Sequence, residues 1–153
     1  MIAKPIMSQD EIAHILSAAK QEALRNHWNV TIAIVDDGGH PLALERMDEC
    51  APIAAYIAME KAKSAALGKR PSADYENMIN GGRTAFLSAP NLAGMLEGGT
   101  PITIGKHTIG AIGVSGVQKD QDAQIAQAGA SSIKKLPITE AWNADNPFFQ
   151  IGR

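Results

Sequence analysis

The sequence predicts an α+β domain in which an antiparallel sheet, built from two β-hairpins, is covered by helices. Two observations carry this prediction. Two β-branched segments each turn back through a glycine-containing turn, which is typical of hairpins rather than of strands joined singly by helices. Segments with apolar residues at helical spacing lie before, between and after these hairpins. The length of 153 residues fits one domain.

The first predicted helix runs from about Gln9 to Asn26. It starts at the capping box Ser8-Gln9-Asp10-Glu11, whose hydroxyl and carboxylate each satisfy a free amide at a helix start. The apolar residues that follow recur at helical spacing and predict one buried face, formed by Ile12, Ile15, Leu16, Ala19, Ala23 and Leu24.

Two hairpins supply the predicted strands. The first joins Val30–Val35 to Leu42–Met47 through the turn Asp37-Gly38-Gly39-His40, where glycine permits the left-handed backbone of a tight turn. The second joins Pro101–Ile104 to Thr108–Ser115. Because both pairs are hairpins, we expect a mainly antiparallel sheet.

Three further helices are predicted between and after the hairpins. The residues that mark their ends are a proline or a polar cap at the start and glycine or lysine at the end. They are an alanine-rich helix at Ile53–Leu67, a short helix at Ala73–Ile79 capped by Ser72, and a final helix at about Gln121–Lys134 capped by Asp120 or a neighbour. The segment Arg83–Glu97 is predicted to be irregular.

The domain is predicted to occupy residues 1–136, followed by a tail over 137–153. The tail begins at Pro137 and carries Trp142, Phe148 and Phe149. Aromatic residues in a terminal segment favour docking on the domain itself or on a neighbouring subunit.

Composition excludes several classes of function. A net charge of −2 gives no basic field for nucleic acid, and seven aromatic residues are too few for a base-stacking platform. No apolar run approaches the ~20 residues of a membrane span. The lone Cys50 forms no intrachain disulfide, which favours a cytoplasmic location.

Two cations are candidates for binding an anionic ligand. Arg46 ends a predicted strand, where its planar guanidinium could hold a carboxylate through two parallel bonds. The alternative is that Arg46 pairs with Asp48 or Asp36 and stabilises the strand end. Lys61, in the alanine-rich helix, is either a second cation for the ligand or part of a solvated helix face.

The pair Gly98-Gly99 is a candidate for ligand contact through main chain. Consecutive amides in such a turn can cradle an anion, although a tight turn or close packing on a neighbouring subunit explains glycine equally well. The four histidines show no metal-ligand spacing, so no metal site is predicted.

Several motifs occur together in one order, and the chain resembles the GlcG/HbpS family, the haem-degrading domains that include the C-terminal domain of PduO-type corrinoid adenosyltransferases. The resemblance covers about Gln9 to Ile133. The motifs are Val35-Asp36-Asp37-Gly38-Gly39, Arg46-Met47-Asp48-Glu49, Lys61-Ala62, Gly98-Gly99-Thr100-Pro101-Ile102 and Gly110-Ala111-Ile112-Gly113-Val114-Ser115-Gly116. The chain departs from the common pattern at Glu49-Cys50, where the family has glycine and then alanine.

The resemblance implies a profilin- or PAS-like sheet, assembly into homo-oligomers, and haem or another tetrapyrrole as ligand in some members. Family members sit beside glycolate, diol and cobalamin pathways. If haem binds, His14 is the candidate axial ligand because it is the only histidine inside a predicted helix. Met47 and Cys50 are weaker candidates as soft ligands.

The first hypothesis for function is therefore an oligomeric binding protein for an anionic, largely apolar molecule such as haem, accessory to a catabolic or cofactor pathway. In it Arg46, Lys61, Gly98 and Gly99 contact the ligand. The alternative is a small enzyme acting on an organic acid, with Arg46 as carboxylate anchor and Lys61 or Cys50 in proton or nucleophile chemistry. A third hypothesis is a structural subunit whose glycine clusters serve assembly.

Overall fold

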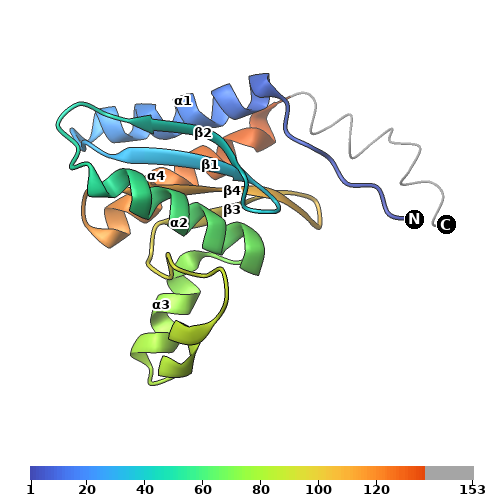
Figure 1. Ribbon diagram of the computed structural model, residues 1–153. Helices are drawn as coiled ribbons and strands as arrows, with labels where there is room; N and C mark the ends of the chain where they lie inside the picture. The colour runs from blue at the N-terminus through green and yellow to red at the C-terminus, as the bar shows by residue number, and fades with distance from the viewer. Residues whose placement is uncertain (137–153) are drawn as a thin grey trace.

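Residues 1–136 are described by a computed structural model, which shows one four-stranded antiparallel sheet with helices on both faces (Figure 1). The first hairpin is β1 (Thr31–Asp36) and β2 (Pro41–Arg46), and the second is β3 (Gly99–Ile104) and β4 (His107–Ser115). The strand order is β2-β1-β4-β3, so the hairpins meet at an antiparallel β1–β4 pair. The predicted α+β class and both hairpins are confirmed. The predicted docking of the tail concerns 137–153, outside the described residues.

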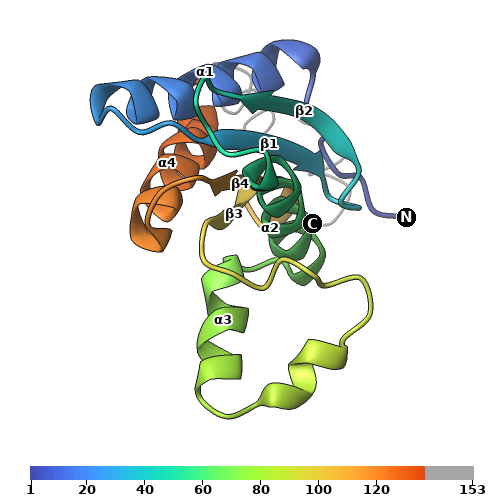
Figure 2. The same cartoon turned by 60° about the vertical axis from the view of Figure 1, so that its left-hand side comes forward.

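Helices cover the two faces unequally. The helices α1 (Gln9–Arg25) and α4 (Lys119–Ser132) pack together on one face, and α2 (Ile53–Gly68) lies on the other (Figures 1 and 2). The helix α3 (Ser72–Asn80) and the 3-10 turn Thr84–Ser88 stand away from the sheet. A second 3-10 turn, Ile133–Lys135, follows α4.

Alternation along the strands sends different side chains to each face. On the α1–α4 side the core is branched and large, including Ile32, Ile34 and Ile112. On the α2 side Ala33, Val35 and Ala111 meet the alanines of α2. Small residues on both partners let α2 lie close to the sheet. Gly113 shows how close, because a Cβ there would be 2.1 Å from the Ala58 carbonyl oxygen.

Local signals in the sequence set most element boundaries. At the start of α1, the predicted capping box is present: the Glu11 amide donates to Ser8 Oγ at 3.3 Å, and the Ser8 amide donates to the Glu11 carboxylate at 2.6 Å. In the β1–β2 turn, Gly39 has φ +78°, as the predicted left-handed turn position requires.

One predicted cap is wrong, and another falls on a neighbour of the residue named first. Ser72 is the first residue of α3 rather than its cap, and its hydroxyl instead bonds the Leu96 carbonyl and the Gly99 amide. The cap of α4 is Gln118, which forms a capping box with Gln121, in place of Asp120. In both cases a tertiary contact or a neighbouring side chain competes for the role that local sequence suggests.

The carboxylate of Asp36 organises the β1–β2 turn. It accepts bonds from the Gly38 and His40 amides at 2.9 Å each and from His40 Nδ1 at 3.0 Å. Burial raises the pKa of Asp36, but these hydrogen bonds outweigh it and hold the pKa below its usual value. A lowered pKa in the folded state contributes stability above the unfolded pKa and loses it as pH falls through the folded value.

We therefore expect Asp36→Asn to destabilise the protein near neutral pH and to lose that effect in acid. Urea denaturation of both proteins at several pH values measures the difference, which should be steady above about pH 5 and vanish as pH falls well below about 3.9. A difference that is the same at pH 7 and in strong acid would contradict this account of the turn.

In the part of the chain that the structure describes, no helix has the length and apolar character needed to cross a membrane.

Candidate functional site

One face of β2 presents an apolar surface that ends in a cation. Ala43 and Glu45 point toward α1, since Ala43 packs on the core beneath it and Glu45 forms an ion pair with Lys20. Alternation sends Leu44 and Arg46 to the other face, which α2 covers only in part, and Leu42 lies at the register shift that follows on the same strand. Leu42 is 41% exposed and Leu44 is 46% exposed. We call Leu42, Leu44 and Arg46 the β2 face.

The Arg46 side chain is exposed and forms no ion pair or hydrogen bond with another residue of the described 1–136 region. The alternative interpretation paired it with Asp36 or Asp48. Asp36 is instead bonded within its own turn. The guanidinium therefore keeps all of its donors available for an external acceptor such as a carboxylate.

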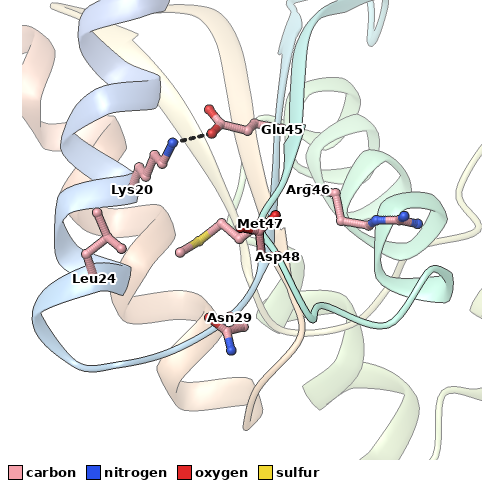
Figure 3. A pocket seen from close by; sticks show the side chains of 7 residues that line it. All are labelled: Lys20, Leu24, Asn29, Glu45, Arg46, Met47 and Asp48. Carbon is pink, nitrogen blue, oxygen red and sulfur yellow. Dashed lines mark hydrogen bonds and ion pairs between the residues drawn. The ribbon is translucent and has the colours of Figure 1, made fainter.

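A pocket of about 240 Å³ opens at the same end of β2 but on the α1 side. Its lining is mixed in polarity: Lys20, Leu24, Asn29, Glu45, Arg46, Met47 and Asp48. Figure 3 shows the side chains of Met47 and Arg46 leaving the strand end in opposite directions, with Met47 toward Leu24 and Arg46 toward α2. The charged end of Arg46 thus serves the β2 face, and the Met47 thioether serves the pocket.

Lys61 is buried, with only 4% of its surface exposed. Its ammonium lies 2.9 Å from Asp122 Oδ2 and 2.9 Å from the Val114 carbonyl oxygen. Burial raises the pKa of Asp122, while the charge and hydrogen bond of Lys61 and the amides of Val117 and Gly116 act in the opposite direction without cancelling it. This ion pair ties α2 to the start of α4 across the end of β4.

Gly98 and Gly99 lie directly against this ion pair. A Cβ on Gly98 would be 2.9 Å from Lys61 Nζ, and one on Gly99 would be 2.3 Å from the Lys61 carbonyl oxygen. The Gly99 amide donates to Ser72 Oγ at 2.8 Å. Glycine is therefore needed here because α2 of the same chain packs on this main chain.

The structure brings Lys61, Gly98 and Gly99 together but places Arg46 elsewhere. Gly99 pairs with Gly113, which pairs with Ala33, which pairs with Leu44. Gly99 and Arg46 thus lie on opposite edge strands, which are about 14 Å apart at three strand spacings. The four residues therefore do not form one cluster within a protomer. Ligand contact by the Lys61–glycine group stays a prediction.

His14 is half-buried on α1, which covers the face of the sheet opposite the Arg46 side chain. Arg46 and His14 of one protomer therefore lie on opposite faces of the sheet. Among residues 1–136, no three His, Cys, Asp or Glu side chains come together as a set that could hold a metal ion.

The departure at Glu49-Cys50 has a local structural meaning. Glu49 has φ +63°, a left-handed conformation that glycine adopts at lower cost than any other residue. Cys50 is buried, and its sulfur lies 3.5 Å from Thr31 Oγ1 and 3.9 Å from the Ser115 carbonyl oxygen. The thiol fills a packing position beneath the loop that follows Arg46.

Two important features were missed by reasoning from sequence alone. The sequence did not indicate Asp122 as the buried partner of Lys61. The exposure of Leu42 and Leu44 was also unexpected, although their alternation with Ala43 and Glu45 was a usable signal for two distinct faces.

The fold and this site define an α+β domain in which an arginine, unpaired among residues 1–136, ends an exposed apolar strand face. Comparison with known proteins makes the assignment more specific. Residues 7–131 match the family described as haem degrading protein HbpS-like, and the chain belongs to this family.

Protein GlcG of Escherichia coli strain K12 is 56% identical over 115 residues, which cover 75% of this chain and 85% of that protein. The crystal structure of HbpS aligns with a TM-score of 0.77 and 27% identity, over 86% of this chain and 92% of that one. The structure described as a PduOC:heme complex aligns with a TM-score of 0.76 and 24% identity, over 84% and 95% of the two chains. The family resemblance inferred from the motifs is confirmed.

Proposed function

We propose that this protein is an oligomeric binding protein for haem or a related tetrapyrrole, which it holds on the β2 face. The observation that carries the proposal is the row Leu42, Leu44 and Arg46, in which two exposed apolar side chains lead to one unpaired guanidinium. A tetrapyrrole is a flat apolar ring with carboxylates on its edge, so its two kinds of surface match this row. Membership of the haem degrading HbpS-like family supports the same ligand class.

The residues present fit the ring and its carboxylates. Leu42 and Leu44 would lie against the ring, and Arg46 would hold a carboxylate in two charge-assisted bonds. When bound, haem supplies an iron centre capable of redox chemistry. The protein's own contribution is to orient the ring and to exclude water from one of its sides.

Axial ligation by His14 needs a second copy of the chain. Because His14 and Arg46 lie on opposite faces of the sheet, the predicted pair can serve one haem only across a subunit contact. A homo-oligomer is therefore part of the proposal. The role as an accessory to a catabolic or cofactor pathway stays a prediction.

Haemin titration of the purified protein, followed by its Soret band, tests the proposal. Arg46→Met should raise the Kd for haemin roughly 10- to 100-fold, because a hydrogen bond to a charged group contributes about 1.5–3 kcal/mol. Arg25→Met is the matched control, since Arg25 is an exposed arginine on α1, on the other side of the sheet.

The arginine control should bind haemin like the unmodified protein. Equal affinities for all three proteins would overturn the assignment of the β2 face. His14→Ala should change the shape of the Soret band if that histidine ligates iron, and an unchanged band would remove its predicted role.

The alternative function is an enzyme that acts on a small organic acid with Arg46 as anchor. Arg46 contributes to the lining of the pocket beside Met47, but its guanidinium points away from that pocket toward α2. The pocket's volume of about 240 Å³ lies below the roughly 300–1,000 Å³ of pockets for drug-sized ligands, so a small acid fits it better than a macrocycle. Lys61 and Cys50, the groups considered for proton or nucleophile chemistry, are both buried and lie outside this pocket's lining. Turnover of a small hydroxy or oxo acid that is lost in Arg46→Met and needs no haem would favour this alternative.

A further inference from the structure

The helix α2 is apolar on more than the side that faces the sheet. Its alanines cover the sheet, yet its opposite side carries Tyr56, 74% exposed, and Leu67, which is also exposed. A helix of a globular protein that covers a sheet on one side usually presents polar residues on the other. The two exposed apolar side chains indicate a partner surface on this outer side, which the β1–β2 turn covers only at its Lys63–Leu67 end, where Gly39 lies against both side chains.

The outer side of α2 carries one continuous stripe. Tyr56, Glu60, Lys63 and Leu67 are spaced i, i+4, i+7 and i+11, which aligns them along one side of a helix. Ala58 and Ala62 lie on the sheet side, where Gly113 contacts their backbone. We call these four residues the α2 stripe.

The α2 stripe reads apolar, acidic, basic, apolar along the helix. Reversed, it reads apolar, basic, acidic, apolar, so it complements itself when two copies of the helix run antiparallel. Glu60 then faces the partner's Lys63, and Tyr56 faces the partner's Leu67. Within the described residues, neither Glu60 nor Lys63 forms an ion pair, so both charges are available for such contacts.

We infer that the α2 stripe is a twofold interface at which two copies of this chain pack α2 against α2 in antiparallel orientation. A twofold contact requires self-complementarity of this kind. When a residue of one copy contacts a given position of the other copy, the residue at that position contacts the first residue's equivalent in turn. This contact would be the surface through which the oligomer proposed above assembles, and it does not depend on haem. A second copy placed here would also wall one side of the β2 face, because α2 contacts β2.

Sedimentation of the full chain without haem, over a range of concentrations, tests this interface. The unmodified protein should sediment as a dimer or a multiple of it. Glu60→Lys and Lys63→Glu should each weaken association roughly tenfold, since each single reversal creates two like-charge contacts per dimer. The double variant E60K/K63E restores both pairs and should return association to within about threefold of the original.

Two further variants sharpen the test. Tyr56→Ser removes an aromatic side chain that is already exposed in the protomer, so it should fold normally and weaken association roughly 30-fold. Lys106→Glu is a charge reversal in the exposed β3–β4 turn and should have no effect.

Three results would overturn the inference. They are a monomer at every concentration, an oligomer unaffected by either single reversal, or a double variant no better than the singles. Haemin binding is measured separately, so failure of this interface and failure of the haem proposal are distinguishable.

Discussion

Asp122→Asn is expected to lower the free energy of unfolding by about 3–5 kcal/mol, the usual cost of leaving one charge of a buried ion pair without its partner. The side chains of Lys61 and Asp122 are only 5% and 4% exposed, so water cannot replace the lost carboxylate. The Val114 carbonyl oxygen would remain as an acceptor, but a neutral dipole does not balance a buried ammonium.

Urea denaturation with a matched control measures this effect. Asp120→Asn removes an exposed carboxylate from the same first turn of α4 and should cost much less. The double variant Lys61→Met with Asp122→Leu removes both charges and should recover most of the loss, because buried ion pairs replaced by apolar residues are often neutral. An Asp122→Asn protein as stable as the Asp120→Asn protein would refute the structural role of the pair.

Gly113→Ala is expected to cost about 3 kcal/mol or more. The new Cβ would lie 2.1 Å from the Ala58 carbonyl oxygen and 2.5 Å from the Ala62 amide nitrogen. Both are backbone atoms of α2, so the clash is relieved only if the whole helix moves away from the sheet. Overpacking of a close-packed interior costs about 1–3 kcal/mol when side chains can adjust, and here they cannot.

Gly81→Ala is the control for this substitution. A Cβ at Gly81 would be 3.1 Å from the nearest atom, the Asn77 carbonyl oxygen, at the exposed end of α3. Thermal unfolding of the two variants should differ clearly. Similar melting temperatures would mean that α2 is held on the sheet less tightly than the structure shows. The same movement of α2 would disturb the α2 stripe, so Gly113→Ala should also weaken self-association.

Local patterns predicted the helices and strands well because each pattern depends on the backbone conformation of the same few residues. The capping box at Ser8 and the glycine turn before His40 set the start of α1 and the first hairpin, as observed. The motif order predicted the family, which the comparisons confirm. Boundaries failed where a side chain had a tertiary partner, as at Ser72, whose hydroxyl bonds Gly99 27 residues away.

The site was predicted less completely. Arg46 was selected for its place at a strand end, and the structure shows its guanidinium unpaired and exposed among the described residues. Lys61 and Gly98-Gly99 were grouped with it because all four residues suit an anion. The sequence carries no information on which edge of the sheet each hairpin occupies. The strand order places β2, which carries Arg46, and β3, which begins at Gly99, on opposite edges.

By itself, the sequence determined the family, the hairpins and helices, and the alternation that separates Leu44 and Arg46 from Glu45, because these depend on neighbours along the chain. Only the tertiary structure decided that Lys61 pairs with Asp122 and that Leu42 and Leu44 stay exposed. It also decided that the absence of a side chain at Gly113 lets α2 pack against β4. Burial and pairing between distant residues depend on how the elements pack, and packing is a property of the whole fold.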